Sequence, residues 1–231
     1  MDDMERYGDY NEIDEPPSKS LVLTVIKILI AVVCLSVVGV IGFRIFLFNR
    51  YPDSMTKLYF NDTLTAYYNE TNGDIGAKTQ SLRTPYDDPD NASFFCDNLI
   101  VINGADQLQV SVRYNVSAIG FFEEKYGVTG LDADDEDLIS FRLVDNYGRV
   151  YDNVSYVGAD SMMMYRYRKV VFDDVILEGN EDGKDPEWIR IEFFIKDLSG
   201  DEPYSMIPVY ENNEVYNVFN DYTLSDEEKP Q

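Results

Sequence analysis

The clearest group of charged and aromatic side chains is a basic cluster formed by Tyr165, Arg166, Tyr167, Arg168 and Lys169. Side chains alternate between the two faces of a strand, so the arginines would share one face and the tyrosines the other. Arginine and tyrosine are both enriched at recognition surfaces, which makes the cluster a candidate partner surface. The alternative is that these cations pair with the many carboxylates of the chain, and exposed pairs of that kind contribute little stability.

A second pattern, Ser54-Met-Thr-Lys57, matches the S-x-x-K of penicillin-binding enzymes, in which a lysine activates a serine. Those enzymes also carry S-D-N and K-T-G motifs, and neither occurs downstream. A polar turn is therefore the better interpretation of these residues.

Two acidic segments, 132–137 and 180–185, are rich in the carboxylate oxygens that calcium prefers. An EF-hand loop would need glycine at the position of Asp137 and glutamate at that of Leu143, so the first segment does not match. We expect both segments to be solvated loops.

The remaining composition argues against catalysis. The chain has no histidine, which removes the usual general base and the commonest metal ligand. A G-x-S-x-G motif, a glycine-rich phosphate loop and a multi-cysteine metal set are also missing. Its 43 acidic residues always allow some carboxylate pair, so a carboxylate-based hydrolase stays open as an alternative. We predict a protein that is not an enzyme, with no catalytic, cofactor-binding or metal-binding residues and no cofactor.

Residues 21–48 form a long apolar run that carries two charges, Lys27 and Arg44. About 20 apolar residues cross the hydrocarbon layer of a bilayer, and both charged side chains are long enough to reach the headgroups. The run exceeds the length of a signal peptide, and no small-x-small cleavage site follows it. Val33, directly before Cys34, argues against a lipoprotein signal. We predict an uncleaved transmembrane helix in contact with membrane lipid.

Charge bounds the partners and bears on the orientation. The net charge of −24 repels nucleic acid, so no nucleic-acid partner is expected. Basic residues flank the helix almost evenly, and the positive-inside rule does not decide between the two orientations. We predict a single-pass protein of the cell membrane, with residues 1–20 as a disordered acidic cytoplasmic tail and the C-terminal domain extracytoplasmic. N-x-Ser/Thr sequons, which become glycosylated only in a eukaryotic secretory lumen, occur at Asn61, Asn69, Asn91, Asn115 and Asn153.

Residues 49–93 are expected to be a juxtamembrane region outside the main domain. Asp62 is a candidate N-cap for a short helix ending at Tyr68. The stretch 69–91 is rich in Asn, Asp, Gly, Thr and Pro, which is typical of a loop.

From Phe94 onward, alternating apolar residues predict short strands. A short helix is expected over 118–126, and the turn at 145–148 predicts a hairpin that leads into a strand over 149–157. Trp188 opens a strongly apolar strand and is expected in the core. Residues 94–224 thus predict an antiparallel β-sandwich of immunoglobulin-like architecture with one short helix, and a β-barrel is the alternative. Residues 225–231 are expected to be a polar tail.

Two motifs add a resemblance to a known family. Leu143-Val-Asp-x-x-Gly-x-x-Tyr151, followed by Arg168-Lys-Val-Val-Phe172, resembles the telokin-like, immunoglobulin-like domains of unknown function on membrane-anchored Gram-positive bacterial proteins. Those domains often carry a Pro-Gly step before the second motif, where this chain has Met162-Met-Met164. The resemblance implies a surface β-sandwich without assigned catalysis, and it carries over no functional residues.

The sequence therefore favours a membrane-anchored extracytoplasmic binding or structural module that is not catalytic, with a protein or envelope component as the candidate partner. Two alternatives are open, an accessory subunit of a membrane complex and a carboxylate-based hydrolase acting on envelope polymers. The ligand and the oligomeric state are left open by the sequence.

Overall fold

The computed structural model describes residues 19–48, 51–82, 94–178, 183–212 and 219–230. The chain divides into two compact units, Met1–Arg50 and Tyr51–Gln231. Residues 1–18 of the predicted tail over 1–20, the sequon at Asn91 and residues 180–182 of the acidic segment 180–185 fall outside the described residues.

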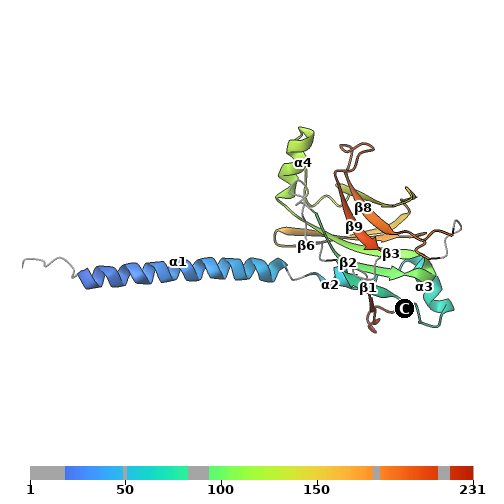
Figure 1. Cartoon of the computed structure of the whole chain (residues 1–231), viewed down its shortest axis with the longest axis horizontal. Coiled ribbons are helices and arrows are strands. Elements are labelled where there is room, and N and C mark those ends of the chain that lie inside the picture. The colour runs from blue at the N-terminus through green and yellow to red at the C-terminus, as the bar shows by residue number, and fades with distance from the viewer. Residues whose placement is uncertain (1–18, 49–50, 83–93, 179–182, 213–218, 231) are drawn as a thin grey trace, which may run out of the picture. The chain divides into compact units, whose positions relative to one another are not determined.

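The described part of the first unit is the helix α1 (Lys19–Phe48) (Figure 1). Its stretch Leu21–Phe46 has a mean hydropathy of 2.9, and none of that stretch is buried against protein. Apolar side chains project on every side, with exposed fractions of 72% for Leu35 and 66% for Val38. The predicted apolar helix is confirmed, and its length and composition suffice to cross a membrane.

The second unit is built on two antiparallel sheets, here called sheet A and sheet B. Sheet A has the strand order β10-β1-β2-β3-β7-β6, and sheet B has the order β5-β4-β8-β9. The strands of sheet A are β1 (Lys78–Ser81), β2 (Phe94–Ile102), β3 (Gln107–Asn115), β6 (Val154–Met162), β7 (Tyr165–Phe172) and β10 (Asn220–Asp221). Those of sheet B are β4 (Ile139–Asp145), β5 (Val150–Tyr151), β8 (Trp188–Ile195) and β9 (Ser205–Glu211). The short helices are α2 (Asp53–Thr56), α3 (Asp62–Glu70), α4 (Ala118–Tyr126) and the 3-10 turn η2 (Asn103–Ala105).

The main core lies between the two sheets. Phe94 of β2 stacks on Phe193 of β8 with ring centroids 4.4 Å apart, and both side chains are fully buried. Val110 from sheet A and Leu143 and Ile191 from sheet B belong to the same buried cluster. Each such side chain contributes roughly 1.5–3 kcal/mol of hydrophobic stabilisation. The predicted mainly β architecture of packed antiparallel sheets is therefore confirmed.

Sheet A is covered on its outer face as well, so the unit has a third layer. Every residue of β3 from Gln107 to Tyr114 is buried, on both faces of the strand. The covering elements are residues 51–61, hereafter the cover segment, together with α3. Figure 1 shows α2 and α3 beside β1 to β3, on the side away from β8 and β9. A second apolar cluster lies in this layer and includes Leu58, Leu64, Ile75, Ile100 and Ile102.

This third layer changes the predicted domain boundary. The domain begins at Tyr51 rather than at Phe94, because the cover segment and β1 belong to the same compact unit as the sheets. Part of the predicted 69–91 loop is β1, which pairs with β2 along its whole length. The short helix after residue 61 is confirmed, but its N-cap is Asn61, whose side chain accepts a hydrogen bond from the amide of Leu64 at 2.9 Å.

Two further predictions need correction. The predicted strand 149–157 is divided between two sheets, since β5 pairs with β4 whereas β6 pairs with β7. Trp188 is only partly buried, because it is the first residue of β8 and its ring is covered by the guanidinium of Arg190 at 4.3 Å. The core side chains of β8 are instead Ile189, Ile191 and Phe193.

The Asp-x-x-Gly-x-x-Tyr motif has a structural explanation in the β4–β5 hairpin. The Asp145 carboxylate accepts hydrogen bonds from the amides of Tyr147 and Arg149, both at 2.9 Å, and from the hydroxyl of Tyr151 at 3.2 Å. Gly148 has φ +78°, a conformation that glycine adopts without strain. The motif therefore stabilises the turn of this hairpin. The resemblance to telokin-like domains stays a prediction.

Candidate functional site

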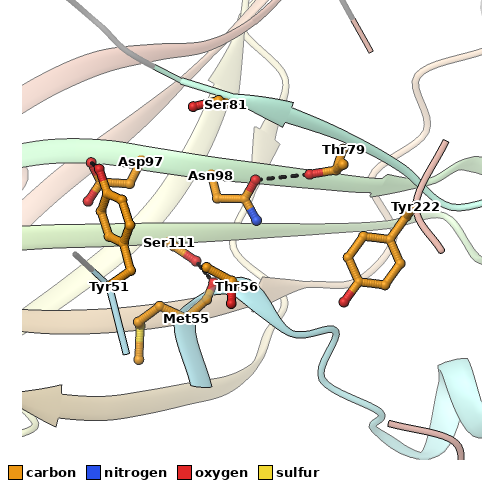
Figure 2. A pocket seen from close by; sticks show the side chains of 9 residues that line it. All are labelled: Tyr51, Met55, Thr56, Thr79, Ser81, Asp97, Asn98, Ser111 and Tyr222. Atoms are coloured by element: carbon orange, nitrogen blue, oxygen red, sulfur yellow. Dashed lines mark hydrogen bonds between the residues drawn. The ribbon is translucent and has the colours of Figure 1, made fainter. Parts of the chain in front are cut away.

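A cavity of about 260 Å³ lies on the outer face of sheet A, between the cover segment and the strands (Figure 2). Its walls come from α2, β1, β2 and β3, with Tyr51 and Tyr222 at two sides. Most of the lining side chains carry a hydroxyl, amide or carboxyl group: Tyr51, Thr56, Thr79, Ser81, Asp97, Asn98, Ser111 and Tyr222.

A β-bulge in β2 places two consecutive polar residues in this cavity. Cys96 pairs with Val112 and Asn98 with Ser111, so Asp97 is an extra residue between them. Cys96 is buried in the core between the sheets, whereas both Asp97 and Asn98 line the cavity. Bulges redirect side chains in this way because they interrupt strict alternation. The bulge therefore brings a carboxyl and an amide together on one side.

Asp97 is engaged by two neighbours. Its Oδ2 lies 3.1 Å from Nε of Arg113, and the two side chains are only 8% and 1% exposed. The hydroxyl of Tyr51 donates to Oδ1 at 3.1 Å. Burial raises the pKa of the Asp97 carboxyl to about 6, an effect that the charge of Arg113 and the Tyr51 hydrogen bond oppose but do not cancel. Burial and the nearby carboxylate also raise the pKa of Tyr51 to about 12, so Tyr51 is a hydrogen-bond donor at neutral pH.

Arg113 sits among aromatic rings behind the cavity. Its guanidinium carbon lies 5.1 Å from the ring centroid of Tyr51, 5.3 Å from that of Phe95 and 5.2 Å from that of Tyr165. Tyr167 hydrogen-bonds the same guanidinium. Cation–π contacts of this kind offset part of the cost of burying the charge. Two tyrosines of the predicted basic cluster thus support the buried ion pair.

Lys169, a third member of the cluster, holds the cover segment in place. Its ammonium group is buried and donates to the carbonyl oxygens of Met55, at 3.4 Å, and of Lys57. The hydroxyl of Ser111 also donates to the carbonyl of Met55. Burial lowers the pKa of Lys169 to about 8. These bonds fix α2, which forms one wall of the cavity.

The two arginines of the cluster lie on the opposite face of β7, toward the acidic segment 132–137. Arg168 is 1% exposed and donates to the carbonyl of Asp135 at 3.0 Å and to the hydroxyl of Tyr114 at 3.2 Å. Arg166 forms an ion pair with Asp134 through two nitrogens. The predicted sharing of faces by the arginines and by the tyrosines is as observed.

The cluster as a whole does not form one exposed surface. Tyr167, Arg168 and Lys169 are buried by the cover segment on one side and the acidic segment on the other, so these three members of the candidate partner surface are not exposed to a partner. Tyr165 and Arg166 are partly exposed, and a partner contact there stays a prediction.

The other sequence patterns have local structural partners. Ser54 donates to Asp160 at 2.6 Å, whereas Lys57 pairs with Glu227 at 3.0 Å, so the S-x-x-K residues engage different carboxylates. In the segment 132–137, the Asp132 and Asp135 side chains accept hydrogen bonds from amides two residues later. Within the described part of the chain, no group of His, Cys, Asp and Glu side chains is arranged to hold a metal ion.

Sequence reasoning missed Asp97, Arg113 and Tyr51. The sequence held one indication of a buried charge. Arg113 is the single charged residue of the alternating segment 107–114, whereas a strand with one face in solvent would usually carry several charged residues. The bulge at Asp97 could not be foreseen, since its position depends on pairing with β3. No family model, curated protein or solved structure matches this chain.

Proposed function

We propose that the chain is a single-pass membrane protein that presents the Tyr51–Gln231 unit outside the cell as a binding module without catalysis. The observation that carries the proposal is α1, whose apolar side chains are exposed on every side from Leu21 to Phe46. Such a surface is costly in water and favourable in a bilayer. The helix satisfies its own backbone hydrogen bonds, as a membrane span requires.

The orientation is supported by charge. An acidic unit is repelled by the anionic lipids of a cytoplasmic leaflet, and the net charge of the chain is −24. The outer surface of a membrane, with fewer anionic headgroups, offers less repulsion. The resemblance to membrane-anchored Gram-positive surface domains points to the same side.

A binding role is supported by the cavity. Asp97 and Arg113 neutralise one another, and Lys57, the base that an S-x-x-K motif requires, pairs with Glu227 rather than with Ser54. A nucleophile or general base would need a free partner in place, as in an activated serine–base pair. The cavity instead offers fixed donors and acceptors, which is how small-molecule sites set orientation.

Membrane placement is tested by carbonate extraction of cells that express the full-length chain. We expect the protein to stay in the membrane pellet at full length. Protease added to intact cells or protoplasts should then digest the acidic unit, followed with an antibody against it. A unit that is digested only after the membrane is permeabilised would reverse the orientation, and release by carbonate would remove the anchor.

A further inference from the structure

We propose that the cavity between the cover segment and sheet A binds a small, uncharged, polyhydroxylated molecule of about the size of a monosaccharide. The inference rests on the proposed binding role and names the ligand class of that site. It is carried by the volume of the cavity, by its charge balance and by the groups that point into it.

Size limits the ligand first. The cavity measures about 260 Å³, just below the range of about 300–1,000 Å³ that is typical of sites for drug-sized molecules. The occupant is therefore one ring or a short polyol rather than an extended chain. The carbon atoms of Met55 and Tyr51 provide apolar contact for the C–H faces of such a ring.

Charge excludes ionic ligands. Asp97 is the charged residue among those lining the cavity, and Arg113 pairs with it at 3.1 Å. An anion would meet this carboxylate inside a chain of net charge −24. A cation would compete with Arg113, which is 1% exposed and surrounded by aromatic rings. An uncharged molecule has neither cost.

The groups at the walls match hydroxyls. The Asn98 side-chain oxygen accepts a hydrogen bond from Thr79 at 2.9 Å, which fixes the amide with its nitrogen toward the cavity (Figure 2). Among the described residues, that nitrogen has no acceptor. Ser81 presents a further hydroxyl. The Tyr222 hydroxyl already donates to Glu228 and accepts from the amide of Leu58, so it offers a ligand only its remaining lone pair. Asp97 Oδ1, which accepts from Tyr51, can accept a second hydrogen bond. A sugar hydroxyl both donates and accepts, so it can pair with each of these groups.

The test uses the full-length protein in a detergent without a sugar headgroup. Glucose, N-acetylglucosamine and myo-inositol are titrated separately, with binding followed by ligand-detected NMR and by the shift in melting temperature. We expect at least one of them to bind and glucuronate, a charged sugar of similar size, to bind at least tenfold more weakly. Absence of binding by all three, or equal binding of glucuronate, would overturn the proposal.

Variants assign the binding to this cavity. Asn98→Ala removes the free amide, and Ser81→Leu adds side-chain volume at the wall. Each is expected to weaken binding about tenfold or more, the effect of losing roughly 1.4 kcal/mol. Asn103→Ala, at an exposed position outside the cavity, is the matched control and should bind as the unmodified protein does.

Binding that persists unchanged in both cavity variants would place the sugar elsewhere and overturn the proposal. This outcome is separate from the placement test. A cytoplasmic acidic unit would defeat the proposed orientation while sugar binding by the purified protein could still be measured, and a protein that binds no sugar can still be an extracytoplasmic module.

Discussion

Arg113 and Asp97 can both be buried because they form an ion pair with one another. Both side chains are almost fully buried, and an unpaired charge at either position would lose its hydration without compensation. The aromatic rings around Arg113 and the Tyr51 hydroxyl on Asp97 complete the environment of the pair. At the scale of single residues, this pair is the feature whose removal should have the largest effect.

Arg113→Met tests that expectation. The methionine retains much of the apolar volume but leaves the Asp97 carboxylate buried without its cation. We expect the free energy of unfolding at pH 7 to fall by roughly 3–5 kcal/mol, measured by urea denaturation. Lys196→Met is the control, since Lys196 and its partner Asp137 are largely exposed and their pair should contribute little. Equal effects of the two substitutions would contradict the structural role of the buried pair.

The raised pKa of Asp97 predicts how the free energy of unfolding changes with pH. Its pKa is raised from 3.8 to about 6, chiefly by burial, so the folded state binds a proton more readily than the unfolded state does. The stability contribution of this group is therefore fully present below pH 4 and is lost as the pH rises through 6. Asp97→Asn should remove that fall from the curve of unfolding free energy between pH 4 and 7. A curve of the same slope in the variant would mean that other groups cause it.

At this scale, the burial of single side chains could not be predicted from residue type, because it depends on contacts with other elements. Trp188 was expected in the core because it opens an apolar strand, but the first position of β8 lies where burial is only partial. Lys169 and Arg168 were expected at a surface because lysine and arginine are seldom buried. Their partners include backbone carbonyls of Lys57 and Asp135, and no pattern within the sequence of β7 indicates those contacts.

At the scale of elements, the cover segment is held against β3 by glutamine side chains. Gln109 bonds the backbone of the cover segment in the way that a neighbouring strand would. The Gln109 amide accepts from the backbone N–H of Tyr59 at 3.0 Å and donates to its carbonyl at 2.7 Å. Next to it, Gln107 donates to Asn61 at 3.0 Å and to Asp173 at 2.7 Å. The cover segment is thus hydrogen-bonded to the sheet without being one of its strands.

Gln109→Leu should release this segment locally. The substitution leaves the N–H and C=O of Tyr59 without partners, and each buried unsatisfied group costs about 1–3 kcal/mol. We expect faster amide hydrogen exchange over residues 57–61, measured by mass spectrometry or NMR. The amides of β8 serve as an internal control, because the opposite sheet does not contact Gln109 through any of these bonds. Unchanged exchange over 57–61 would show that other contacts hold the segment.

The strands were predictable, but the cover was not. Alternation predicted β3 and β4, and short apolar runs predicted β2 and β8, because these strands meet the apolar core. The same alternation misleads for β3, whose Gln107, Gln109 and Ser111 look like a solvent face and are instead buried under the cover segment. Polar residues that are satisfied by another layer cannot be told from exposed ones by periodicity alone.

At the scale of the whole molecule, the two units meet different requirements. The helix α1 exposes apolar side chains throughout its described length, whereas the Tyr51–Gln231 unit buries its apolar residues in two clusters. The long apolar helix was foreseen from its composition. The start of the folded unit was placed too late, because residues 51–81 are polar in composition and contribute to the core through a few residues such as Leu58 and Leu64.

The observed domain start at Tyr51 and the start at Phe94 that was expected from the sequence predict different behaviour for two soluble fragments. A fragment of residues 51–231 keeps all three layers, and we expect it to fold alone, with β-dominated circular dichroism and one cooperative unfolding transition. A fragment of residues 94–231 lacks β1, α3 and the cover segment. It would therefore expose Ile100 and Ile102, which are fully buried in the complete unit. It also leaves Lys169, Gln109 and the Asp97–Arg113 pair open to solvent on the outer face of sheet A.

The shorter fragment should aggregate or unfold at a much lower urea concentration, because exposed apolar strand surface promotes association. Sedimentation velocity and urea denaturation of the two fragments at equal concentration provide the measurement. Ile100→Thr in the longer fragment is a useful comparison, since it weakens the contact with the cover without removing any element. If residues 94–231 unfold as cooperatively and as late as residues 51–231, the cover layer is dispensable and the domain begins where the sequence alone placed it.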